Sequence, residues 1–267
     1  MPLFNTGLKL AALVLFLGFG LAAQAIVIRH DRADAGYRVD EKAFPQVFYL
    51  HYRFNNKVCM GTLISSQWAI TAAHCTDQTP IQATLDRQEA YHLSIGGQSY
   101  DIAELVIHPD YHPNDSMAVD LALIRLDRDV PAIRPVTLYR DSDELNKVVS
   151  FLGWGYTGYG TVGRKSNDGH FRRAQNTVFQ AGQWLRFRFD DPRRRDQHAL
   201  QLEGVPGLGD SGGPALLETD TGLFILGVAR GEIADPADPQ APEGLYGAIE
   251  LYERISSHQD WIDQTLL

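Results

Sequence analysis

Short apolar segments separated by turns are the feature of this sequence that most restricts its fold. Segments of about four to eight residues, rich in Val, Ile, Leu and Phe, are bounded by Gly, Pro, Asp and Asn. They lie at 58–65, 68–71, 102–107, 121–126, 148–153, 185–189, 214–217, 223–229 and 245–250. Because almost no helical pattern intervenes, an antiparallel barrel or sandwich is favoured. One helix is expected at the end, at 252–266, where Ile255, Trp261, Ile262 and Leu266 loosely share a face.

The first 25 residues have the pattern of an export signal. Lys9 is the only charged residue among them, residues 10–21 are apolar, and Ala23 and Ala25 have the spacing that a signal peptidase recognises. A transmembrane anchor is the alternative, but a span needs about 20 apolar residues. We therefore expect residues 1–25 to be a cleaved signal peptide and the protein to be secreted or periplasmic.

Charge and cysteine content narrow the choice of partners. The formal net charge is −9, which disfavours nucleic acid, and acidic residues flank the one basic run at 193–195. The two cysteines, Cys59 and Cys75, predict one disulfide in an exported chain, whereas two free thiols fit such a chain poorly. Two cysteines cannot complete a zinc site, and the sequence has no HExxH motif. No metal and no cofactor are expected.

Three loop-like segments lie between or beside the expected strands. Residues 127–138 contain two prolines near the middle of the chain and are expected to connect two halves. The Gly-rich residues 154–169 and the Asp- and Pro-rich residues 235–242 are expected to form surface loops.

Two segments carry a base and a group that can orient it, which amide hydrolysis requires. His74 lies in residues 71–75 (TAAHC), where a Cys59–Cys75 bridge would fix its loop. Asp120 begins residues 120–126 (DLALIRL), and its carboxylate can accept a hydrogen bond from one ring nitrogen of His74. Either residue alone is more often structural.

A third segment, residues 209–214 (GDSGGP), carries a nucleophile. Glycines at 209, 212 and 213 permit a tight backbone that holds Ser211 at a bend. The N–H groups of Gly209 and Ser211 can then point the same way and form an oxyanion hole. Taken alone, such a segment is a common loop.

TAAHC, DLALIRL and GDSGGP, in this order and with spacings of 46 and 91 residues, resemble the trypsin/chymotrypsin family of serine peptidases. Residues 153–155, 244–246 and 261–262 resemble further elements of that family, whose bacterial secreted members with one disulfide are the most similar. The resemblance implies an all-β fold of two antiparallel six-stranded Greek-key barrels, at 26–130 and 140–267, the second followed by the helix. It also implies a triad, in which His74 takes the proton of Ser211 and Asp120 orients His74.

The resemblance also places a substrate pocket. Relatives that cut after basic residues have an Asp six residues before the nucleophile, where this chain has Val205. An apolar floor offers no counter-ion to Lys or Arg, so we predict cleavage after apolar or aromatic residues. Gly231, Gly244 and Tyr246 are expected in the pocket walls, and acidic residues at 235, 238 and 243 are an alternative source of negative charge.

In the family, a new N-terminal Ile or Val pairs through its ammonium with the Asp before the nucleophile, here Asp210. Ile26 follows the expected signal cleavage, so signal peptidase would create the activating terminus. Two departures are Ile28-Arg29, where relatives have Gly-Gly, and Ala229-Arg230, where relatives have Ser and an aromatic residue. The alternative is that Ile26 merely begins a surface strand.

The sequence favours an endopeptidase over three other interpretations. A non-catalytic binding protein on the same fold would lose a triad residue, and all three are present. An esterase with a GxSxG elbow would have its nucleophile before the acid and the His. An appended peptide-binding module is not expected either. The expected partner is a protein or peptide substrate, and the mature form is expected to be a monomer that binds neither membrane nor nucleic acid.

Overall fold

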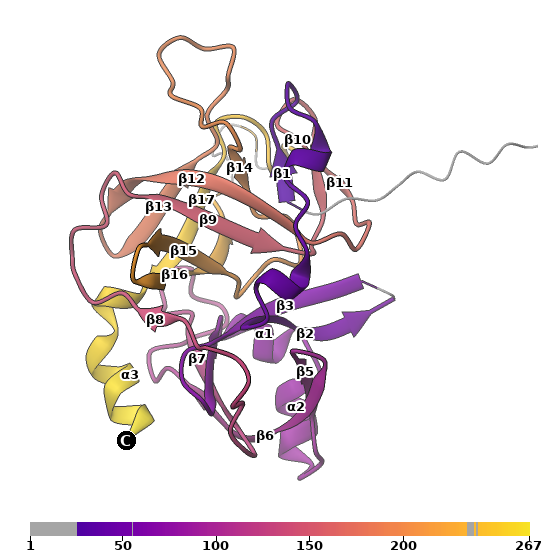
Figure 1. Cartoon of the computed structure of the whole chain (residues 1–267), viewed down its shortest axis with the longest axis vertical. Coiled ribbons are helices and arrows are strands. Elements are labelled where there is room, and N and C mark those ends of the chain that lie inside the picture. The colour runs from indigo at the N-terminus through magenta and orange to yellow at the C-terminus, as the bar shows by residue number, and fades with distance from the viewer. Residues whose placement is uncertain (1–25, 55, 234–237, 239) are drawn as a thin grey trace, which may run out of the picture.

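The computed structural model describes residues 26–54, 56–233, 238 and 240–267 of the 267-residue chain. The predicted signal peptide and much of the predicted 235–242 loop, Asp235 included, lie outside the described residues. Two barrels are stacked, and the C-terminal helix lies beside the lower one (Figure 1). The prediction of an all-β fold with a C-terminal helix is confirmed.

The first barrel is a six-stranded antiparallel sheet in the order β2-β3-β4-β7-β6-β5. Its two edges meet where Tyr91 donates a hydrogen bond from its hydroxyl to the Leu50 carbonyl, at 2.9 Å. Apolar residues from every strand fill its interior. The strands are β2 (Val47–Arg53), β3 (Asn56–Leu63), β4 (Trp68–Thr71), β5 (His92–Ile95), β6 (Gln98–Ile107) and β7 (Ala122–Leu126).

The second barrel is a closed ring of six antiparallel strands, because β15 pairs with both β9 and β16. Phe151, Phe187 and Tyr252 pack at its centre, with ring centroids 4.9 to 5.1 Å apart. The strands are β9 (Val148–Gly153), β12 (Arg172–Ala181), β13 (Trp184–Arg188), β15 (Pro214–Thr219), β16 (Gly222–Glu232) and β17 (Ile249–Arg254), and the short β8 (Thr137–Leu138) extends β16 in parallel.

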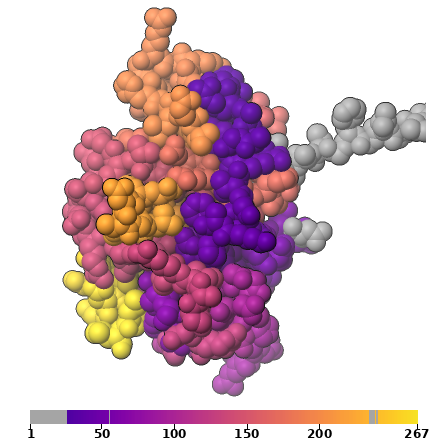
Figure 2. Space-filling view, viewed as in Figure 1, coloured from indigo at the N-terminus to yellow at the C-terminus, as the bar shows by residue number. Residues whose placement is uncertain are grey.

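A four-stranded sheet that the sequence did not predict joins the start of the chain to the second barrel. Its order is β11-β10-β1-β14, with β1 (Ile26–Ile28), β10 (Thr157–Tyr159), β11 (Gly163–Ser166) and β14 (Gly204–Val205). β1 therefore pairs within the second half of the chain rather than with the first barrel, and the N-terminal segment crosses from the upper to the lower half (Figure 2). The expected loop at 154–169 contains two of these strands.

Two corrections concern the end of the chain and the disposition of Ile26. The strand expected at 245–250 is β17, at 249–254, so the terminal helix α3 (Gln259–Leu266) begins later than predicted, after a 3₁₀ turn (Ile255–Ser257). The side chain of Ile26 is fully buried, so the alternative of a surface strand is wrong.

Short helices and the disulfide complete the structure. Cys59 of β3 and Cys75 of α1 (His74–Asp77) form the expected disulfide bond. α2 (Ile81–Asp86) follows, and two 3₁₀ turns (Asp34–Gly36 and Glu41–Ala43) precede the first barrel. In the part of the chain that the structure describes, no helix combines the length and the apolar character that spanning a bilayer requires.

Candidate active site

His74 and Asp120 meet at one edge of the first barrel. β4 ends just before His74, β7 begins just after Asp120, and the two strands pair with Thr71 opposite Ala122. The Asp120 carboxylate accepts two hydrogen bonds from His74, at 2.6 Å from Nδ1 and at 2.8 Å from the backbone N–H. Asp120 is only 5% exposed. Two bonds to one residue fix the ring orientation and direct Nε2 away from the carboxylate.

A buried carboxylate that the sequence analysis missed supports Asp120 from behind. Glu253 accepts hydrogen bonds from the Asp120 backbone N–H at 3.1 Å and from Trp184 Nε1 at 3.3 Å. It also pairs with Arg230, whose other contacts are the carbonyl oxygens of residues 116 and 118, just before Asp120. Arg230 therefore anchors the segment that leads to Asp120.

Ser211 lies in a tight bend between the barrels. Gly209 and Gly212 have φ values of +100° and +78°, which glycine adopts readily. Two consecutive N–H groups of β3 bind this bend: Cys59 donates to the Gly209 carbonyl at 2.9 Å and Met60 to the Ser211 carbonyl at 2.8 Å. Among the described residues, the N–H groups of Gly209 and Ser211 donate no hydrogen bond to the chain. Neither donor is therefore engaged within the described part of the chain, and of the two residues Ser211 lines the cavity described next.

One cavity of about 310 Å³ joins the two halves of the site. His74 and Ser211 both line it. Within the described residues no hydrogen bond connects the Ser211 hydroxyl to the imidazole, and His74 Nε2 lies 3.8 Å from Cys75 Sγ. The structure thus brings His74 and Asp120 into direct contact and brings Ser211 into the same cavity.

Asp210 is a buried carboxylate, only 1% exposed, held by two backbone amides. Its oxygens accept hydrogen bonds from the N–H groups of Gly155 at 2.6 Å and Gly207 at 2.8 Å. Burial raises the pKa of Asp210 to about 7, and the two amides oppose that rise. A side chain at Gly153 or Gly155 would overlap this carboxylate, which explains the glycines that flank Trp154.

Ile26 pairs with the chain two residues beyond the Gly155 amide that binds this carboxylate. It is the register partner of Thr157, two residues after Gly155, and the Thr157 hydroxyl donates to the Ile26 carbonyl. Ile26 has φ of +58°, which is unfavourable for a β-branched residue. The predicted partners Ile26 and Asp210 thus border the same Gly155–Thr157 segment.

The expected pocket residues separate into two groups. Gly231 lines the cavity, whereas Val205, Gly244 and Tyr246 are not among the described residues that line it. Val205 is fully buried and packs with Val27, its register partner, in an apolar cluster that includes Tyr246. Val205 therefore packs beside β1 and is not part of the described lining of this cavity.

The cavity wall is acidic instead. Glu232, Glu243 and Glu250 line it together with Arg164, and none of these except Glu243 was considered from the sequence. Burial raises the pKa of Glu250 to about 8, an effect that the Arg164 guanidinium opposes and that the Glu232 carboxylate increases. The sequence analysis named acidic residues at 235, 238 and 243 as an alternative source of negative charge. Of these, Glu243 lines the cavity, and Glu232 and Glu250 supply the other acidic groups.

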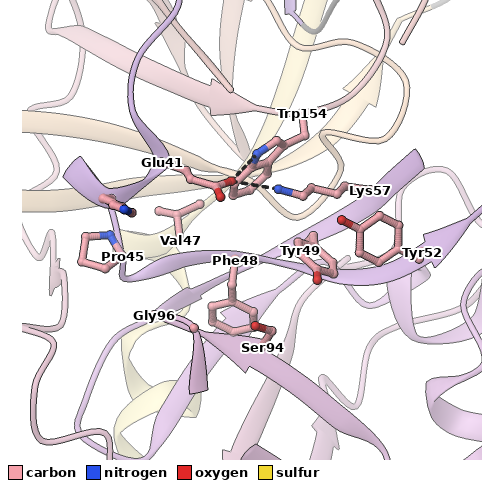
Figure 3. A pocket seen from close by; sticks show the side chains of 12 residues that line it. Glu41, Pro45, Val47, Phe48, Tyr49, Tyr52, Lys57, Ser94, Gly96 and Trp154 are labelled. Atoms are coloured by element: carbon pink, nitrogen blue, oxygen red, sulfur yellow. Dashed lines mark hydrogen bonds and ion pairs between the residues drawn. The ribbon is translucent and has the colours of Figure 1, made fainter. Parts of the chain in front are cut away.

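A second cavity, of about 390 Å³, lies against β2 and contains neither His74 nor Ser211 among its described lining residues (Figure 3). Glu41 accepts hydrogen bonds there from Trp154 Nε1 at 3.0 Å and from Lys57 Nζ at 2.8 Å. The Lys57 ammonium also lies 4.4 Å from the Trp154 ring centroid. These contacts join Glu41, Lys57 of β3 and Trp154 to one another, so they connect three segments of the chain.

His74 is close enough to Cys59 and Cys75 for the three to resemble a metal-binding group. Both sulfur atoms belong to the disulfide, so neither can act as a thiolate ligand.

Comparisons with known proteins agree with this architecture. The family model for trypsin matches residues 34–262. An uncharacterized peptidase from Corynebacterium glutamicum is 28% identical over 78% of this chain and 63% of its own length. Serine protease Hayan from Drosophila melanogaster is 29% identical over 85% of this chain and 38% of its own. The chain thus spans less than two thirds of the length of these relatives.

A solved structure has the same fold. Neuropsin, described as a serine protease expressed in the limbic system of mouse brain, superposes with a TM-score of 0.61 at 17% identity. The match covers 86% of this chain and 98% of neuropsin.

Proposed function

Because this chain belongs to the trypsin family, we propose that it is a serine endopeptidase that acts through His74, Asp120 and Ser211. The observation that carries the proposal is the cavity that contains both Ser211 and a His74 bonded twice to Asp120. Glu253 and Arg230 hold the backbone of Asp120 and so support the position of the base.

The proposed reaction follows from the positions of these groups. Ser211 Oγ attacks the carbonyl carbon of the scissile bond as its proton passes to His74 Nε2, and Asp120 stabilises the imidazolium. The N–H groups of Gly209 and Ser211 bind the oxyanion. The C–N bond then breaks, His74 protonates the leaving amine, and an acyl ester remains on Ser211. Water, deprotonated by His74, hydrolyses this ester and restores the hydroxyl.

Activation by removal of residues 1–25 is part of the proposal. Cleavage would give Ile26 an ammonium next to the segment that binds the Asp210 carboxylate. It would also remove the peptide bond that defines the unfavourable φ of Ile26. If this ammonium pairs with the Asp210 carboxylate, removing one partner should lower the free energy of unfolding by about 3–5 kcal/mol. N-terminal sequencing of the exported protein tests this step, and a start other than Ile26 would contradict it.

The substrate is proposed to be a protein or peptide that reaches an exported, monomeric enzyme outside any membrane and without nucleic acid. The expected preference for apolar residues rested on Val205 as the pocket floor. Since Val205 packs beside β1 and is not part of the described lining of the cavity, and since carboxylates line it, that preference loses its structural support.

Labelling with a fluorophosphonate tests the proposed function. The mature protein should react stoichiometrically, with the adduct on Ser211 by mass spectrometry, and Ser211→Ala should abolish it. His74→Ala should slow labelling while leaving the fold intact. A folded protein that carries no adduct would instead support the alternative, a non-catalytic binding protein on the same fold.

A further inference from the structure

The acidic wall of the cavity is occupied by a side chain of the protein itself. Arg164 belongs to β11, and its guanidinium extends into the cavity that Ser211 lines. Its side chain is only 13% exposed. Arg164 Nη2 lies 3.4 Å from Glu250 and 3.6 Å from Glu232, and Nη1 pairs with Glu243.

Two of these carboxylates are neighbours in the sheet itself. Glu232 of β16 and Glu250 of β17 are register partners, and the side chain of Glu250 is only 2% exposed. Like charges directly opposite each other destabilise a sheet, and burying a carboxylate is costly unless a cation pairs with it. Such a pair at the wall of a cavity is therefore suited to a cation.

Apart from the direct pair with Glu243, the side-chain contacts of Arg164 are poor for a purely structural arginine. Its contacts with Glu232 and Glu250 exceed 3.3 Å, and its buried Nε has no hydrogen-bond partner in the described part of the chain. Arg172, whose fully buried side chain faces two carboxylates, forms four bonds of 2.6–3.0 Å with Asp34 and Asp168. Charge-assisted bonds of an optimised pair have the lengths seen at Arg172.

The segment that carries Arg164 lies at the edge of its sheet. Among the described strands β11 pairs with β10 alone, and the Arg164 backbone N–H donates to the Glu243 carbonyl at 2.8 Å. One guanidinium thus faces three carboxyl groups, more than it can pair with in good geometry.

We propose that Arg164 is an internal occupant of the substrate cavity, and that it competes there with a lysine or arginine side chain of the substrate. Glu232, Glu243 and Glu250 are the counter-ions that the substrate cation would share or take over when Arg164 withdraws. This inference rests on the proposed function of the same cavity. The proposal replaces the expected cleavage after apolar residues with cleavage after basic residues, whose binding Arg164 weakens by competition.

Binding to a catalytically inactive protein tests the proposal without depending on turnover. In the Ser211→Ala background, calorimetry compares benzamidine, a planar aromatic cation, with benzamide, its neutral counterpart. Adding Arg164→Gln should tighten benzamidine binding by about tenfold or more and leave benzamide binding unchanged. Adding Glu250→Gln to that variant should reverse most of the gain. No gain, or an equal gain for benzamide, would overturn the proposal.

Two further measurements separate the possible failures. Arg164→Lys keeps the charge on a shorter chain, so it should fold even if Arg164→Gln does not, and it should still gain about threefold in benzamidine affinity. Fluorophosphonate labelling of the Arg164 variants with Ser211 intact reports on the proposed function. Labelling without any gain in benzamidine affinity would refute the role of Arg164 alone, whereas loss of labelling in the wild-type protein would refute the peptidase.

Discussion

The two walls of the central cavity differ in how well their charged groups are paired. On the catalytic wall, Asp120 binds His74 twice, and Glu253 binds Asp120, Trp184 and Arg230. On the opposite wall, three carboxylates share Arg164 through contacts that are mostly long. The difference fits the two proposals, in which the first wall holds the catalytic groups and the second accepts a cation.

Removing the charge of Asp120 should have the largest effect. Asp120→Asn keeps the shape of the side chain but favours the wrong tautomer of His74, so kcat should fall by about 10⁴-fold with little change in KM. Kinetics on a chromogenic peptide amide measure this. A loss below tenfold would mean that the well-paired wall is not the catalytic one.

Stability should distinguish Arg172 from Arg164. Arg172→Met leaves Asp34 and Asp168 without their cation and should lower the free energy of unfolding by about 3–5 kcal/mol. Arg164→Met should cost about 1 kcal/mol or less, because burial raises the pKa of Glu250 to about 8 and the protonated carboxyl is not left as an unpaired buried charge. Urea unfolding of both variants makes the comparison. Equal losses would show that Arg164 is a structural arginine.

The acidic wall should also make stability depend on pH. Burial raises the pKa of Glu250 to about 8, above its ordinary value of 4.5, so the folded state holds this proton more tightly than the unfolded chain does. Stability from Glu250 is therefore complete below about pH 4.5 and is lost as pH rises toward 8. The free energy of unfolding of Glu250→Gln, measured by urea unfolding, should equal that of the wild type at pH 4.5 and exceed it at pH 8. The same difference between the two proteins at every pH would contradict this.

The support behind Asp120 should give the smallest effect. Glu253→Gln weakens the ion pair with Arg230 and should lower kcat by about tenfold at unchanged KM. Glu144→Gln is the matched control, since Glu144 is a buried partner of Arg254 that does not line the cavity. It should lower stability without lowering kcat. If both variants lose the same activity, the effect of Glu253 is general destabilisation.

The catalytic wall was accessible to sequence reasoning because its residues sit in contiguous motifs. His74, Asp120 and Ser211 each adjoin a strand end or a glycine bend that the sequence itself marks. The two barrels were implied by the family resemblance that these motifs carry, and the disulfide by the two cysteines of an exported chain. The sequence also indicated the glycine requirement at 209 and 212.

The acidic wall depends on pairings that no local pattern reveals. Glu250 faces Glu232 only because β17 begins at Ile249, four residues later than expected from 245. Arg164 reaches the cavity from a strand that reads as a Gly-rich loop, and Val205 packs beside β1, which is distant in the chain. The positions of these residues therefore depend on strand register and on the pairing of strands that are distant in the chain. Neither can be deduced readily from a single segment of the sequence.

A crystal structure of the mature protein inhibited by a peptidyl phosphonate would test most directly whether this cavity carries out the chemistry. The phosphorus should be bonded to Ser211 Oγ, with one phosphoryl oxygen about 2.7–3.1 Å from the N–H groups of Gly209 and Ser211, and with His74 Nε2 beside the adduct. A phosphonate attached to another residue, or an adduct whose oxygen points away from both amides, would contradict the account.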